Sequence, residues 1–283
     1  MKLSDFLNDF YVPLRLIGKS KRTVKLYNYS IRLFSKHLGR QAELDDLDDL
    51  TVSRHLGAML DDGKSPYSVQ KERDQLLAIW RLAARKNLIK EWPEVARVVV
   101  PEIVPKAYSQ AELKRLFDAC SKEKGYICEI PAADWWKALN CVLLDTAERI
   151  TAVMAAKFTD IYDNSIIFHA ENRKGGRKSN ICYLRPKTLV AIERIRNPKR
   201  KLIFKLDCTM SMLYKRYRKI RERANLDGKP FHIMRATHAS FVEAGGGSAQ
   251  KSLGHDSGKT TKRHYLDPRI VKNDDFTDLL PDV

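Results

Sequence analysis

Apolar side chains recur at helical spacing through most of the first hundred residues. Within residues 20–39 an apolar residue returns every three or four positions, and this spacing predicts an amphipathic helix. Ser20 is suited to cap the start of that helix, and Gly39 is suited to end it. The same spacing predicts two more helices, over residues 52–63 and 66–87.

A segment poor in helix signals then interrupts this pattern. Residues 91–108 contain three prolines and a β-branched run, which favour an extended chain. Directly afterwards, Ser109 and Glu112 have the spacing of a capping box, which opens a new helix. We therefore predict a helical domain over residues 1–104 and a second domain over residues 105–283.

The second domain begins with helical spacing and then changes period. Residues 165–170 and 180–184 alternate in polarity, and the turn sequence RKGGRK joins them, so they are expected to form an antiparallel hairpin. Helical spacing returns over residues 187–197 and 210–225. The predicted fold class is mainly α with a small antiparallel β-sheet, divided into two domains.

Composition adds a candidate partner. The chain has 52 lysines and arginines against 35 aspartates and glutamates, a formal net charge of +17, which favours a polyanionic partner such as nucleic acid. It has no apolar run long enough for a membrane span and no signal-peptide core. Its five cysteines are scattered without a CxxC motif, as expected of reduced thiols in the cytoplasm.

The reactive side chains gather near the C-terminus. His232, Arg235, His255 and Tyr265 follow one another there, and Arg149 precedes them at the predicted start of a helix. Arginine suits a phosphodiester transition state because its planar fork donates paired hydrogen bonds and stays charged. Tyrosine has a pKa of about 10 and needs a base or a positive field to act as a nucleophile. The set is therefore suited to cleaving a phosphodiester with tyrosine.

The order and spacing of these residues resemble those of the tyrosine recombinase (phage integrase) family. The HxxR motif of that family matches residues 232–235, LGH matches residues 253–255, and TxxHY matches residues 261–265. The resemblance implies a two-domain DNA clamp, with a helical core-binding (SAM-like) domain and an integrase-type catalytic domain. It also implies a role for each residue: phosphate binding by Arg149 and Arg235, proton acceptance by His232, hydrogen-bond donation to the phosphate by His255, and nucleophilic attack by Tyr265.

In this family a lysine in a hairpin turn protonates the leaving 5′ oxygen. The turn RKGGRK fits that description, and Lys174 matches the family pattern best. Lys178 is the alternative, and a third reading is that both lysines only contact the DNA backbone.

The resemblance further implies a site-specific DNA recombinase that works through a 3′-phosphotyrosyl intermediate without metal, ATP or other cofactor. Its partners would be double-stranded recombination sites and three further copies of the chain, which form a homo-tetramer on DNA. The C-terminal tail, residues 272–283, is expected to pack on a neighbouring copy. The chain is expected to lack the additional N-terminal domain that binds arm sites.

Basic residues outside the motifs are candidates for contact with the DNA backbone. Their alternative is a solvated basic face. The candidates are Lys71, Arg73, Arg81, Arg177, Lys178, Lys215, Arg218 and Arg221.

Three positions depart from the family pattern. Ala147 stands where glycine is usual, Ala152 where an acidic residue is usual, and Ala236 where histidine is frequent. The acid at the second position normally orients the active site, so support for Arg149 is expected from Glu148 or from elsewhere.

Three other functions compete with recombination. A type IB topoisomerase uses the same chemistry but rejoins the same strand; the short chain and small helical domain favour recombination. A DNA-binding member without catalysis is the second alternative. A metal-dependent nuclease built on His232, His238 and His255 is the third, although a carboxylate partner and ligand spacing are lacking.

Overall fold

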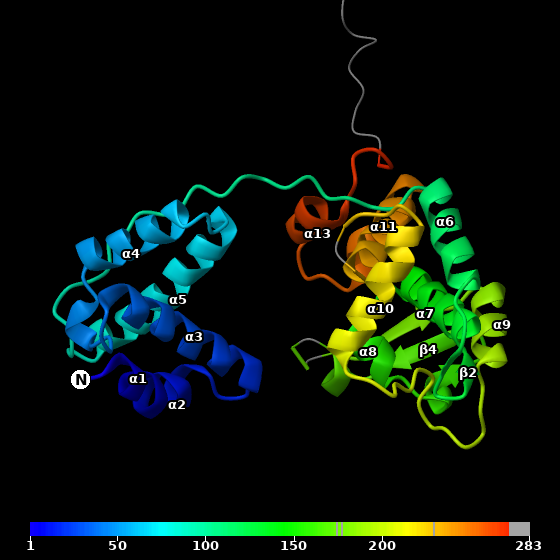
Figure 1. Ribbon diagram of the computed structural model, residues 1–283, viewed down its shortest axis with the longest axis horizontal. Helices are drawn as coiled ribbons and strands as arrows, with labels where there is room; N and C mark the ends of the chain where they lie inside the picture. Colours follow the sequence, from blue (N-terminus) through cyan, green and yellow to red (C-terminus); the bar gives the residue numbers. More distant parts are fainter. Residues whose placement is uncertain (174, 177, 229, 272–283) are drawn as a thin grey trace, which may run out of the picture. The chain divides into compact units, whose positions relative to one another are not determined.

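The structure is a computed structural model that describes residues 1–173, 175–176, 178–228 and 230–271. The chain divides into two compact units, Met1–Glu102 and Ile103–Val283 (Figure 1). Each unit has a hydrophobic core of its own. The architecture is mainly helical with small antiparallel sheets, in agreement with the predicted fold class.

The first unit is all helical. Its α-helices are α1 (Leu3–Phe6), α2 (Val12–Arg15), α3 (Lys21–Leu38), α4 (Asp49–Asp61) and α5 (Pro66–Arg85). The predicted caps of α3 are confirmed: the Ser20 hydroxyl accepts a hydrogen bond from the Thr23 N–H, and Gly39 ends the helix with a φ of 69°. Fully buried aromatic side chains, including Phe34 and Trp80, fill the core of the unit.

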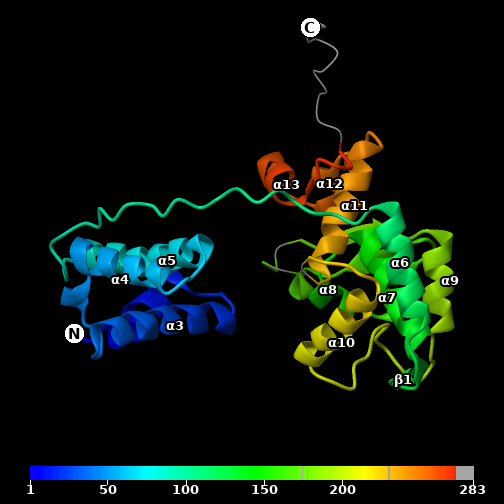
Figure 2. The same ribbon diagram turned by 45° about the horizontal axis from the view of Figure 1, so that its top comes forward.

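The second unit is built around a buried helix. Its helices are α6 (Gln110–Ser121), α7 (Ala132–Thr146), α8 (Ile150–Ala155), α9 (Pro186–Arg194), α10 (Met210–Arg223), α11 (His232–Ala244), α12 (Ala249–Leu253) and α13 (Gly258–Tyr265). Helix α7 carries Trp135 and Trp136, both fully buried, and α6, α9 and α11 pack against it (Figure 2). The predicted capping box of Ser109 and Glu112 opens α6.

Two small antiparallel sheets complete the second unit. The strands are β1 (Tyr126–Ile127), β2 (Ile130–Pro131), β3 (Ile161–Tyr162), β4 (Ser165–Phe168) and β5 (Asn180–Tyr183). The predicted hairpin is confirmed as β4 and β5, in which Phe168 pairs with Asn180. Strand β3 and the β1–β2 ladder were not predicted, because two-residue strands are too short to show alternation. In the described part of the chain, no helix has the length and apolar character needed to cross a membrane.

Candidate active site

Arg235 lies at the centre of the candidate site, on the first turn of α11. Its side chain is buried, and Nη1 donates a hydrogen bond of 2.6 Å to the carbonyl oxygen of Ala147. Nη2 donates to the carbonyl oxygen of Leu253 at 2.9 Å and to Nε2 of His255 at 2.9 Å. Burial, followed by the positive charge of Arg149, lowers the pKa of Arg235. The ends of α7 and α12 therefore fix the guanidinium in place.

The carbonyl of Ala147 points at Arg235 because the backbone turns sharply there. Ala147 ends α7 with a φ of 52°, in the left-handed region. That conformation costs a residue other than glycine about 1–2 kcal/mol, which explains why glycine is usual at this position. Here the methyl group packs in a buried cluster with Ala236 and Ala239. Two of the departures from the family pattern thus belong to the same buried cluster.

Tyr265 lies beside three of the other predicted site residues. Its ring centre is 5.2 Å from that of His232 and 5.0 Å from that of His255. The guanidinium carbon of Arg235 is 5.4 Å from the centre of the Tyr265 ring. His232 is exposed at the start of α11, whereas Tyr265 is 6% exposed. One unit of one chain therefore brings these four side chains together.

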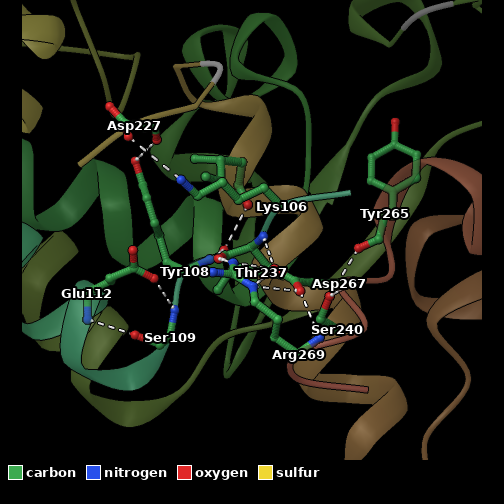
Figure 3. A network of polar contacts seen from close by, with 12 residues as sticks. Lys106, Tyr108, Ser109, Glu112, Asp227, Thr237, Ser240, Tyr265, Asp267 and Arg269 are labelled. Carbon is green, nitrogen blue, oxygen red and sulfur yellow. Dashed lines mark hydrogen bonds and ion pairs between the residues drawn. The ribbon is translucent and has the colours of Figure 1, made fainter. Parts of the chain in front are cut away.

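A network of buried polar groups anchors the main chain of Tyr265 (Figure 3). The Ser240 hydroxyl donates to the Tyr265 carbonyl at 3.1 Å and accepts from the Asp267 N–H at 2.9 Å. The Asp267 carboxylate accepts from the Ala107 N–H at 2.7 Å and pairs with Arg269. Although burial opposes ionisation, these hydrogen bonds lower the pKa of Asp267. The Tyr265 ring and its hydroxyl point away from this network, which holds the backbone of the residue (Figure 3).

His255 accepts a hydrogen bond from Arg235, and its expected donation to a scissile phosphate stays a prediction. Arginine can only donate, so Nε2 of His255 must accept from Arg235. Nδ1 then carries the proton and donates to the Thr261 hydroxyl at 2.9 Å. Burial, then the charges of Arg235 and Arg149, lower the pKa of His255 to about 4. The ring is therefore neutral at physiological pH.

This arrangement predicts an unusual titration. In an NMR pH titration of ¹³C-labelled histidines, His255 should stay neutral down to about pH 4, with its proton on Nδ1. Arg235→Gln removes a positive charge, so the midpoint should rise. An unfolded chain protonates histidine near pH 6.5, so this group makes folding less stable as pH falls from about 6.5 towards 4. A midpoint near 6.5 in the unaltered protein would contradict the arrangement.

Arg149 lies at the start of α8, directly after Glu148. Its charge lowers the pKa of both Arg235 and His255, which places it in the same electrostatic environment. The Arg149 N–H donates to Oε2 of Glu148 at 3.2 Å. Ala152, where the family has an acid, packs in the hydrophobic core with 1% exposure. The carboxylate next to Arg149 is thus that of Glu148.

The turn between β4 and β5 is described in part. Lys174 and Arg177 lie outside the described residues. Lys178 is exposed, and its carbonyl oxygen accepts a hydrogen bond of 2.7 Å from Nη1 of Arg173. The choice between Lys174 and Lys178 as the proton donor stays a prediction.

The candidate DNA contacts separate into exposed and buried groups. Lys71, Arg81, Lys215 and Arg218 are exposed, as contact with DNA requires.

Arg73 and Arg221 are buried, which corrects the expectation that they contact DNA. Nε of Arg73 donates to the carbonyl oxygen of Ala96 at 2.7 Å. Arg221 donates to the Tyr108 hydroxyl at 2.8 Å and to the Gly228 carbonyl at 2.6 Å. Their helical phase was the missed signal, because each follows a buried apolar residue on its helix by four positions. Both arginines support the fold from within.

Among the described residues, no three His, Cys, Asp or Glu side chains are grouped so that they could hold a metal ion. All five cysteines are free thiols. Burial raises the pKa of Cys120 and that of Cys182 to about 12, so neither is a reactive thiolate at neutral pH.

Comparison with known proteins finds similar sequences among the tyrosine recombinases. No family model matches the sequence. The tyrosine recombinase XerA of Saccharolobus solfataricus is 24% identical over 269 residues, which are 91% of this chain and 87% of that protein. The XerA of Pyrococcus horikoshii is 23% identical over 282 residues, with 92% and 88% of the two chains covered.

Solved structures agree in fold. A lambda integrase dimer bound to a core site has a TM-score of 0.76 and 19% identity, covering 97% of this chain and 99% of the solved one. The Tn1549 transposon integrase in complex with circular intermediate DNA has a TM-score of 0.74 and 15% identity, covering 99% and 98%. The fold is therefore that of the integrases. The assembled motifs and the curated relatives both support a relation to the tyrosine recombinase, or integrase, family.

Proposed function

We propose that the protein is a site-specific DNA recombinase that cuts and rejoins strands through a 3′-phosphotyrosyl intermediate. One observation carries the proposal. The centre of the Tyr265 ring is 5.4 Å from the guanidinium carbon of Arg235, 5.2 Å from the ring centre of His232 and 5.0 Å from that of His255. A tyrosine in that position has positive charge beside it for the phosphate and an imidazole beside it for its proton. The curated relatives that match most of the chain are named as tyrosine recombinases.

In the proposed reaction the Tyr265 oxygen attacks phosphorus and its proton passes to His232. The bond from phosphorus to the 5′ oxygen breaks, and that oxygen takes a proton from a lysine of the β4–β5 turn. Arg149 and Arg235 stabilise the charge on the non-bridging oxygens. The 5′ hydroxyl of a partner strand then attacks the phosphotyrosine and releases Tyr265. The bond energy is kept in the phosphotyrosine, so these steps consume neither ATP nor metal.

In the proposed reaction, binding of the phosphate changes the hydrogen-bonding state of His255. A phosphate oxygen needs a donor, so His255 must gain a second proton or exchange tautomers when the phosphate arrives. The negative charge of the phosphate raises the pKa of a neighbouring imidazole, which favours the protonated ring. Binding of the scissile phosphate is thus expected to be accompanied by proton uptake at His255.

In the same proposal the first unit is the helical core-binding domain, and residues 105–283 form the catalytic domain. Exposed Lys71, Arg81, Lys215 and Arg218 contact DNA phosphates. Four copies assemble on two DNA sites in the cytoplasm; lambda integrase has been solved as a tetramer bound to a Holliday junction. The tail that would join neighbouring copies, residues 272–283, lies outside the described residues.

The test begins without knowledge of the target sequence. The protein is incubated with a library of random-sequence duplexes, each nicked so that cleavage near the nick releases a short fragment and traps the covalent complex. Protein-linked DNA should be recovered under denaturing conditions, and sequencing should yield one enriched motif. Recovery of no linked DNA would contradict the proposal. Exchange between two enriched sites is the expected outcome, whereas relaxation of plasmids without exchange would indicate a type IB topoisomerase.

A further inference from the structure

Arg173, the first residue of the RKGGRK turn, contacts Glu148 and Lys178, although the sequence assigned it no role. It stands at the start of the turn between β4 and β5, and its side chain is 12% exposed. Its guanidinium pairs with Glu148, whose side chain is 1% exposed, at 2.7 Å through Nη2 and 2.8 Å through Nε. The Glu148 carboxylate in turn holds the N–H of Arg149. The turn is therefore joined to the first catalytic arginine through one buried ion pair.

The same guanidinium also holds the far end of the turn. Nη1 of Arg173 donates to the carbonyl oxygen of Lys178 at 2.7 Å. Asn180, the first residue of β5, adds a hydrogen bond of 3.1 Å from Nδ2 to Oε1 of Glu148. The residues that begin and end the turn are thus both tied to one carboxylate, directly or through Arg173.

Arg173 also lies near the segment that carries His255. Gly254 ends α12 in the left-handed region with a φ of 64°, and a Cβ built on it would lie 3.6 Å from Nη2 of Arg173, an ordinary van der Waals distance. The guanidinium therefore lies close to the backbone immediately before His255.

We infer that Glu148 and Arg173 are a pair of positioning residues that set the β4–β5 turn against Arg149 and His255, in place of the acid missing at Ala152. The inference rests on the proposed function, in which a lysine of this turn protonates the leaving 5′ oxygen. A fork that bonds a carboxylate and a carbonyl at once is specific to arginine. Lysine keeps the charge of Arg173 but cannot span both partners.

The test separates positioning of the acid from loss of the fold. A suicide duplex built on the enriched motif is made with oxygen or with sulfur at the bridging 5′ position of the scissile phosphate. Sulfur leaves as a thiolate when the phosphorus–sulfur bond breaks, and a thiol loses its proton near pH 8.5, so cleavage no longer needs a lysine to deliver one. Single-turnover formation of the covalent complex is measured on both duplexes.

Arg173→Met should slow cleavage of the oxygen duplex by about 10²-fold, within the range that a displaced general acid costs. On the sulfur duplex it should stay within about 3-fold of the unaltered protein, since the acid is no longer needed. Arg173→Lys and Glu148→Gln should show the same selective defect. If the cleavage rates of the variants fall equally on both duplexes, or do not fall on the oxygen duplex, the inference is wrong.

Arg185→Met is the matched control. Arg185 pairs with Asp145, whose side chain is also 1% exposed, in the same unit and beyond the other end of β5. It should lower the thermal midpoint as Arg173→Met does, yet leave both cleavage rates near those of the unaltered protein. If Met at 173 prevents folding, Arg173→Lys carries the comparison. Failure of the unaltered protein to form a complex on either duplex would instead refute the proposed function.

Discussion

Arg235→Ala should reduce the rate of covalent complex formation by about 10³-fold while DNA binding changes far less. Loss of one hydrogen-bond donor to a developing negative charge typically slows a reaction by about 10²–10³-fold. The guanidinium of Arg235, which lies beside the Tyr265 ring, carries several such donors. Two carbonyl oxygens, of Ala147 and Leu253, would also lose their partner. Single-turnover cleavage of the enriched duplex measures the rate, and gel retardation measures binding.

The control for Arg235 has to separate chemistry from folding, because the residue is 2% exposed. Arg221 is 4% exposed and donates to the Gly228 carbonyl in the same unit. Arg221→Lys should cost stability without slowing cleavage by the folded fraction. Arg235→Lys, which keeps the charge but not the fork, should still slow cleavage by about 10²-fold. Cleavage by Arg235→Lys at the unaltered rate would remove Arg235 from the mechanism.

Tyr265→Phe should abolish the covalent complex, with a loss of at least about 10⁴-fold, because removal of a nucleophile leaves no alternative acceptor for the phosphoryl group. The ring contacts with His232 and His255 are kept by phenylalanine. Stability and DNA binding should therefore remain close to those of the unaltered protein. Denaturing gels of the trapped complex measure the loss.

Tyr183→Phe is the comparison for Tyr265→Phe. Tyr183 is 73% exposed on β5, and the same single hydroxyl is removed. It should form the covalent complex at the unaltered rate. A complex that persists in Tyr265→Phe would show that another side chain is the nucleophile.

Local sequence signals were sufficient for the main helices and the hairpin. The two ends of α3 could be predicted from Ser20 and Gly39, because an N-cap and a left-handed C-terminal residue are properties of single residues. The alternation on either side of RKGGRK found β4 and β5 for a similar reason: the period of a strand is visible in a few residues. Tyr265 and the three reactive side chains beside it were named from short motifs, and the structure brings them together.

The tertiary contacts that hold those side chains in place could not be predicted from local sequence signals. The Arg173–Glu148 pair joins positions 25 apart in sequence, and nothing near either residue indicates its partner. A short motif named His255, but only the tertiary contact with Arg235 shows that its Nε2 accepts a hydrogen bond. Arg73 was expected on an exposed basic face. Its position on the helix instead buries it, and its guanidinium donates hydrogen bonds to backbone carbonyl oxygens. In each case the deciding contact is tertiary.

In the proposed mechanism Tyr265 is the residue that becomes joined to DNA. The most direct measurement is mass spectrometry of the trapped complex, formed in the presence of a metal chelator and digested with protease and nuclease. The account predicts one modified peptide, containing residues 264–266, with a nucleotide 3′-phosphate attached to the Tyr265 oxygen. A nucleotide attached to any other side chain, or a linkage through a 5′-phosphate, would contradict it.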